Sequence, residues 1–213
     1  MRVLYVVGAC LSKNTSANMS HNGYVQGLLE NGCQVDILMA VDSWGQTDDL
    51  LPHWEDAKYY CYPSETIHDR LRKYIGRNVL QPTVSATNSY VQTQEPQKAG
   101  NLKITVREYL KKAYYFLFPI DPKYPLEKQW LKNASKFRAD TEYDLVISNS
   151  SPAASHKLVA ILSHSGHLKY KRWIQIWEDP WYYDLYGGHK AEILDEENAL
   201  LNVATEVFYL SLI

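Results

Sequence analysis

The sequence lacks the common signatures of nucleotide-binding and hydrolytic enzymes. Gly8 is the only glycine close behind the first apolar run, so no GxGxxG motif follows it, and no P-loop of the Gly-Lys-Ser/Thr type occurs. The GxSxG and HExxH patterns are absent as well. These absences weaken a dinucleotide-binding interpretation and remove the usual markers of phosphate-loop, serine-hydrolase and zinc-peptidase chemistry.

Cysteine, net charge and long apolar segments are also scarce. Cys10, Cys33 and Cys61 have no CxxC spacing and lie in or beside apolar runs, so we expect buried, reduced thiols in a cytoplasmic protein. The net charge of −2 offers no basic field for nucleic acid. No apolar stretch approaches the roughly 20 residues of a membrane-spanning helix. Among the histidines only His164 and His167 approach metal-ligand spacing, and they are expected to end a helix, so we predict no metal and no cofactor.

Two apolar segments that end in polar turns carry the clearest prediction. Residues 143–147 lead into the turn 148–152, and residues 172–177 lead into the turn 178–181, with a helix-like segment at 154–164 between them. Strand, helix and strand form a βαβ unit, so the two strands are expected to be parallel neighbours. Both turns then lie at one carboxyl edge of the sheet, where open α/β sheets bind ligands.

The rest of the chain continues the alternation of strands and helices. Further strands are expected at 1–7, 33–39, 57–62 and 206–212, and helices at 20–30, 102–118, 126–139 and 190–202, with Ser20 as the N-cap of the first helix. This order predicts an α/β fold with a Rossmann-like, doubly wound parallel sheet and helices on both faces, in a single domain over residues 1–213. The polar stretch 78–101 is expected to be a flexible excursion and the least ordered part of the chain.

The predicted helix 102–118 is amphipathic, with several lysines and one arginine on its polar side. One interpretation is a peripheral membrane contact or a place for a lipid-linked acceptor. The alternative is a helix that packs on the sheet and exposes its basic face to water.

Residues 116–181 resemble the N-terminal half of a GT-B glycosyltransferase of family 4, as found in one bacterial subgroup. The resemblance is carried by four elements: Phe118-Pro119-Ile120-Asp121, Trp130, residues 147–152, and Ile176-Trp177-Glu178-Asp179-Pro180-Trp181. Residues 196–200 and 204–207 are similar to the helix and strand that precede the linker between the two GT-B domains. Two departures stand out: Ile176 and Glu178 replace an Asp and an Arg of that subgroup, and Gly8 is followed by a polar loop instead of a second glycine.

The resemblance implies the acceptor-side domain of a retaining, metal-independent glycosyltransferase of bacterial surface polysaccharide synthesis. In such enzymes the nucleotide-sugar donor is held mainly by the C-terminal domain, through two glutamates eight positions apart, and no such pair occurs here. We therefore expect a cytoplasmic N-terminal domain that receives a glycan or lipid-linked acceptor and is inactive alone, at the inner face of the plasma membrane if helix 102–118 binds lipid. The chain also stops inside or just past an apolar strand, which is expected if a longer protein is cut at a domain boundary. The alternative is a C-terminal edge strand that closes the sheet. The alternatives are an acceptor-binding subunit of a split GT-B enzyme and a GT-B sugar-nucleotide epimerase.

Asp179 is the first candidate for chemistry and Glu178 the second. A carboxylate at the end of a central strand, at the switch point of the sheet, opens onto the ligand cleft. The alternatives are an ordinary turn residue before Pro180 for Asp179, and a solvated charge for Glu178.

The predicted substrate-binding residues are Gly8, Asn149, Ser150, Ser151, Trp181 and Asp121. Ser150 and Ser151 are expected to head a helix, where hydroxyl and N–H groups hold a phosphate or a sugar hydroxyl, or where they serve as plain N-caps. Trp181 either stacks on a sugar face or packs in the core.

Overall fold

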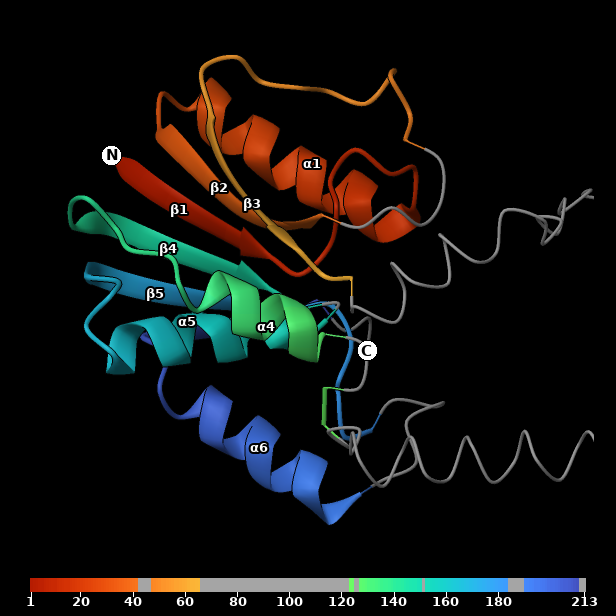
Figure 1. The fold of residues 1–213 in the computed structure, drawn as a ribbon, viewed down its shortest axis with the longest axis vertical. Helices are drawn as coiled ribbons and strands as arrows, with labels where there is room; N and C mark the ends of the chain where they lie inside the picture. Colours follow the sequence, from red (N-terminus) through yellow and green to blue (C-terminus); the bar gives the residue numbers. More distant parts are fainter. Residues whose placement is uncertain (42–46, 66–122, 125–126, 151, 184–189, 211–213) are drawn as a thin grey trace, which may run out of the picture.

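One six-stranded parallel sheet forms the centre of the protein (Figure 1). The computed structural model describes residues 1–41, 47–65, 123–124, 127–150, 152–183 and 190–210. The strands are β1 (Arg2–Val7), β2 (Gln34–Val41), β3 (Lys58–Pro63), β4 (Tyr143–Asn149), β5 (Tyr170–Trp177) and β6 (Glu206–Tyr209). Their order across the sheet is β3-β2-β1-β4-β5-β6, and every neighbouring pair is parallel. The predicted Rossmann-like α/β fold is confirmed.

Helices cover both faces of the sheet, as expected. Helix α1 (Ser16–Glu30) packs on one face, where Val25 joins a cluster with β1 and β2 side chains such as Tyr5 and Ile37. Helices α4 (Lys128–Ala134) and α5 (Ala154–His164) pack on the opposite face, with Trp130 and Leu158 in the second cluster. Helix α6 (Ala191–Leu201) joins α5 and covers Trp177 through Leu200. The central strands are buried on both sides, which explains their near-continuous apolar sequence.

Helix α1 begins earlier than the sequence pattern predicted. Its N-cap is Thr15, whose hydroxyl accepts a hydrogen bond from the backbone N–H of Asn18 at 3.2 Å, so the prediction of Ser20 as N-cap is wrong. The first half of the helix buries polar side chains, Asn18, His21 and Asn22, against the sheet. Apolar periodicity marks a helix by its apolar face, so it indicates only the second half of this helix, whose first half has a polar inner face.

Other bounds differ from the predictions in detail. Helix α4 ends at Ala134 rather than near residue 139, and β6 ends at Tyr209. Cys10 is buried as expected, but Cys33 is only half-buried and Cys61 is exposed, so the prediction of three buried thiols is wrong. Cys61 lies on β3, which is an edge strand, and this strand has no fully buried residue. The predicted helix 102–118 and the predicted excursion 78–101 lie outside the described residues.

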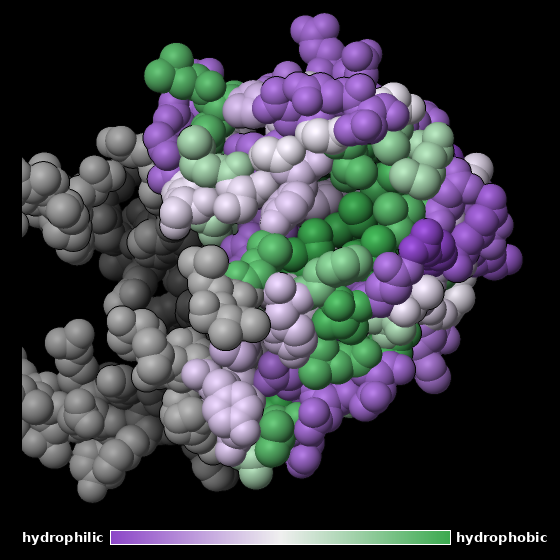
Figure 2. Space-filling view, turned by 180° about the vertical axis from the view of Figure 1, so that it is seen from behind, coloured by the Kyte–Doolittle hydropathy of each residue, from purple (hydrophilic) through white to green (hydrophobic). Residues whose placement is uncertain are grey.

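The sheet leaves part of its apolar surface open on the β5–β6 side. Ile174 and Ile176 are half-buried, and Phe208 is 49% exposed. Figure 2, seen from behind, shows hydrophobic residues gathered across the middle of the described surface with hydrophilic residues around them. Within the described ranges, no helix has the length and apolar character needed to cross a membrane.

Candidate functional site

The carboxyl edge of the sheet gathers most of the residues that the sequence singled out. Strand register places Val7 of β1, Asn149 of β4 and Ile176 of β5 side by side. Gly8, Ser150 and Glu178 follow directly at this edge, so the expectation that both polar turns share one edge is confirmed.

The switch point of the sheet lies between β1 and β4, where the strand order reverses direction. Gly8 and Asn149 are therefore the residues nearest to it. Asp179 follows β5, one strand further on, so the expectation that Asp179 lies at the switch point itself is wrong. The reason is topological: the βαβ unit fixed β4 and β5 as neighbours, but the position of β1 beside β4 depends on long-range pairing.

Gly8 allows two segments to pack closely. A Cβ atom at this position would lie 2.7 and 2.8 Å from ring carbons of Pro152 and 3.2 Å from the ring of Trp130. The backbone N–H of Gly8 donates to Ser155 Oγ at 2.8 Å. This glycine thus brings the end of β1 against the start of α5, and its N–H already has a partner within the chain.

Ser150 connects β4 with β5 instead of heading a helix. Its N–H donates to the carbonyl of Ile176 at 2.8 Å, and its Oγ accepts from the N–H of Glu178 at 2.9 Å. The N-cap of α5 is Ala153, which makes no side-chain cap, so the N-capping prediction is wrong for Ser150. The hydrogen-bond ladder between β4 and β5 extends one residue further than predicted from the sequence, and Ser150 forms this last step. Ser151 and Asp121 lie outside the described residues.

A pocket of about 280 Å³ opens at this edge, on the α5 side of the sheet. It brings together three of the predicted residues, Ser150, Asp179 and Trp181. The other lining residues are Lys123, Tyr124, Glu127, Pro152, Ala153, Trp177 and Pro180. The rings of Tyr124 and Trp181 lie 5.2 Å apart at 36°, so the lining combines an aromatic pair with the carboxylate of Asp179.

The two adjacent carboxylates, Glu178 and Asp179, face different surroundings. Asp179 is exposed and lines the pocket. Glu178 is half-buried on the α1 side, with Oε1 3.9 Å from Nδ1 of His21. Burial raises the pKa of Glu178, the charge of Asp179 adds to this, and the amide of Asn149 acts in the opposite direction. The expected alternation of neighbouring side chains is confirmed, and only Asp179 lines the pocket.

A buried polar cluster behind Glu178 was not predicted from the sequence. Asn149 donates to the Tyr5 hydroxyl at 3.1 Å, and that hydroxyl lies 3.0 Å from Nδ1 of His21. Nε2 of His21 is buried and has no hydrogen-bond partner among the described residues. Burial lowers the pKa of His21 to about 4, so the 3.9 Å approach to Glu178 is no ion pair at neutral pH. The signal available in the sequence was the helical spacing of Asn18, His21 and Asn22.

A second buried cluster links β4, β5 and α5. The Oγ of Ser148 lies 2.7 Å from Nδ1 of His156 and accepts from Nε1–H of Trp173 at 2.8 Å. The imidazole also packs against the ring of Trp177, with ring centroids 4.3 Å apart and the planes tilted by 36°. Burial lowers the pKa of His156 to about 3, so this imidazole is neutral across the physiological range. Ser148, His156 and Trp173 are buried, and the cluster lies behind the pocket that Trp177 lines.

Metal binding receives no support from the described part of the chain, which holds no group of three or more His, Cys, Asp or Glu side chains able to bind one ion. Comparisons with protein-family models, with curated proteins and with solved structures give no match to this chain.

Proposed function

We propose that this chain is the acceptor-side domain of a retaining glycosyltransferase of the GT-B kind, acting in the cytoplasm on a glycan or lipid-linked acceptor. The observation that supports the proposal best is the pocket at the carboxyl edge of the sheet. Three residues predicted from the sequence line it, and one of them, Trp181, forms an aromatic pair with Tyr124. An aromatic face beside a hydrogen-bonding carboxylate suits the apolar face and the hydroxyls of a sugar.

In this proposal Asp179 orients the acceptor and stabilises positive charge on the donor sugar. Its carboxylate is exposed and has no hydrogen-bond or ion-pair partner among the described residues, so it is available to a hydroxyl. The attraction between this carboxylate and the donor sugar grows as positive charge develops in an oxocarbenium-like transition state. An interaction that is stronger in the transition state than in the ground state accelerates the chemical step. Trp181, which is half-buried and backed by the buried ring of Tyr124, supplies the surface against which the acceptor lies.

The donor is assigned to a second domain. The Gly8 N–H donates to Ser155, and Ser150 uses both its N–H and its Oγ within the sheet edge, so these groups offer little to a phosphate. Calorimetry of the 213-residue chain with UDP-glucose and GDP-mannose is expected to show weak binding or none. Tight binding of either nucleotide sugar would contradict the assignment of the donor to another domain.

A further inference from the structure

Helix α6 carries two adjacent buried carboxylates, and their partners lie in two different walls of the pocket. We propose that Glu196 and Glu197 are positioning residues that fix the separation of these walls. The contacts of the two glutamates do not depend on the proposed function. Their consequence for ligand binding rests on it.

Glu197 contacts the first wall, which is formed by the residues that follow β5 in the sequence. Its Oε2 accepts from the backbone N–H of Tyr182 at 2.7 Å, and its Oε1 accepts from the N–H of Trp181 at 3.4 Å. Together with burial, the same carboxylate raises the pKa of Tyr209 on β6. One side chain of α6 thus anchors the segment that directly follows Asp179 and Pro180.

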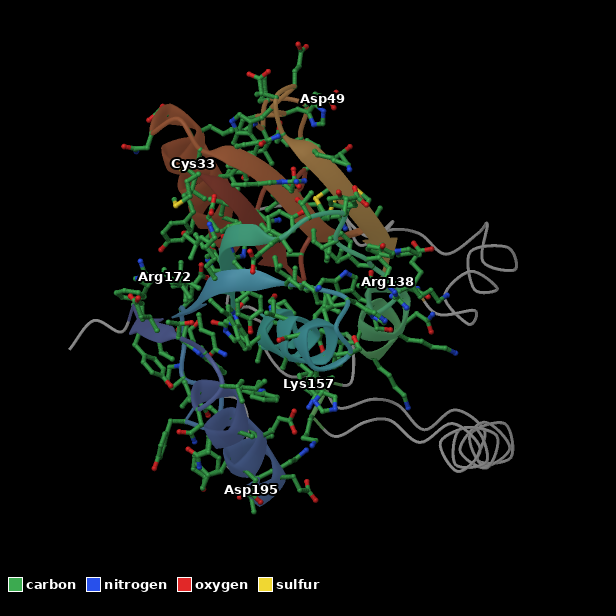
Figure 3. All side chains as sticks on the ribbon, turned by 90° about the vertical axis from the view of Figure 1, so that its left-hand side faces the viewer. Cys33, Asp49, Arg138, Lys157, Arg172 and Asp195 are labelled. Atoms are coloured by element: carbon green, nitrogen blue, oxygen red, sulfur yellow. The ribbon has the colours of Figure 1, made fainter. Side chains whose placement is uncertain are left out.

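Glu196 contacts the second wall, which contains Lys123 and Tyr124. Its carboxylate pairs with Lys123 at 2.6 Å and Lys157 at 2.5 Å, and it accepts from the Tyr124 hydroxyl at 3.2 Å. Burial opposes its ionisation, but the hydrogen bonds from Lys123 and Lys157 outweigh this and lower the pKa of Glu196. Figure 3 shows Lys157 on the side of α5 that faces α6. Asp195 of α6, labelled in the same view, lies at the outside of the molecule.

The two walls meet where the rings of Tyr124 and Trp181 approach each other. Tyr124 is fixed through its hydroxyl by Glu196, and Trp181 through its backbone by Glu197. Because the carboxylate oxygens accept from groups of the chain itself, neither glutamate is needed as a ligand contact. Because the two glutamates are neighbours on one rigid helix, they instead set the distance between Tyr124 and Trp181.

Loss of the Glu197 carboxylate removes a charged acceptor that the backbone N–H groups of Trp181 and Tyr182 share. A buried group that loses a charged partner is destabilised more than one that loses a neutral partner, so the loop should open locally while the sheet stays folded. Amide hydrogen exchange read by NMR measures this opening directly. In Glu197→Ala, exchange of the Tyr182 amide is expected to accelerate roughly ten- to hundredfold.

Three comparisons make the experiment decisive. Glu197→Gln keeps one acceptor oxygen and should restore part of the protection, whereas Asp195→Ala removes an exposed carboxylate of the same helix and should change nothing. The amide of Val146 in the buried strand β4 reports global unfolding and should exchange alike in all variants. Unchanged exchange at Tyr182 in Glu197→Ala, or equal acceleration at Val146, would overturn the positioning role.

Glu196 is tested through its lysine partners. In Glu196→Ala, acetylation of Lys123 and Lys157 by acetic anhydride should increase severalfold relative to the exposed Lys136, because the paired carboxylate no longer holds the ammonium groups. Equal labelling in variant and wild type would contradict the role of Glu196. If these contacts hold but no saccharide binds the wild-type pocket, the proposed function fails and the positioning role survives.

Discussion

Acid should destabilise this protein through two buried histidines. Burial lowers the pKa of His156 from its ordinary value of 6.5 to about 3, and that of His21 to about 4. Between these values and 6.5 the unfolded chain binds more protons than the folded one, so stability falls as the pH falls. At pH 5 each histidine removes roughly 2 kcal/mol of the stability present at high pH, about 4 kcal/mol together. That is a large part of the ~5–15 kcal/mol by which folded domains are stable.

Urea unfolding followed by circular dichroism at pH 7, 6, 5.5 and 5 measures this loss. His156→Asn is the informative variant, because the Asn Oδ1 can take the place of Nδ1 as the acceptor for Ser148 without binding a proton. The variant should be less stable than wild type at pH 7, since it loses the ring contact with Trp177, but its stability should fall only about half as much by pH 5. His164→Asn removes an exposed histidine from the same helix and is the matched control. If His156→Asn kept the full pH dependence of the wild type, the account of buried neutral imidazoles would be refuted.

Two further predictions concern the sheet edge. Gly8→Ala should lower the free energy of unfolding in urea by roughly 1–3 kcal/mol, because its Cβ would clash with Pro152. The control is Gly23→Ala in α1, where a Cβ meets open space, and this change should be neutral or slightly stabilising. Equal effects of the two changes would argue against close packing at Gly8. In the complete enzyme, Asp179→Asn should lower turnover by ~10²–10³ with the fold intact, because the amide loses the negative charge. Glu178→Gln is the comparison, and a silent Asp179 change with an inactive Glu178 change would show that the wrong carboxylate was assigned.

The sheet could be predicted largely from local sequence. The segments that became β1, β2, β4 and β5 are short apolar runs bounded by polar turns, which is how strands buried on both faces appear in sequence. Their alternation with helices predicted parallel pairing, and hence one shared edge for the polar turns. The position of the switch point required the pairing of β1 with β4, which no local pattern reveals.

The site could be predicted only in part, for a physical reason. Asp179, Ser150 and Trp181 follow strands, and the ends of parallel strands meet at one edge whatever the rest of the chain does. His21 and Glu196 are different, because their partners lie far away in the sequence: Glu196 binds Tyr124, and His21 approaches Glu178. From the sequence alone, a polar residue on a helix is predicted to be exposed as long as its buried partner is unknown.

The most direct test of the central claim is an NMR titration of the 213-residue chain with methyl glycosides of common hexoses, followed at the indole Nε1–H of Trp181. The resonance is assigned by Trp181→Phe, and Asp179→Asn serves as the binding-impaired variant. The proposed acceptor site predicts a saturable shift with at least one glycoside, weakened in Asp179→Asn, and little or no shift with UDP-glucose at the same concentration. No shift with any glycoside, or a saturable shift with UDP-glucose alone, would contradict an acceptor site in this pocket.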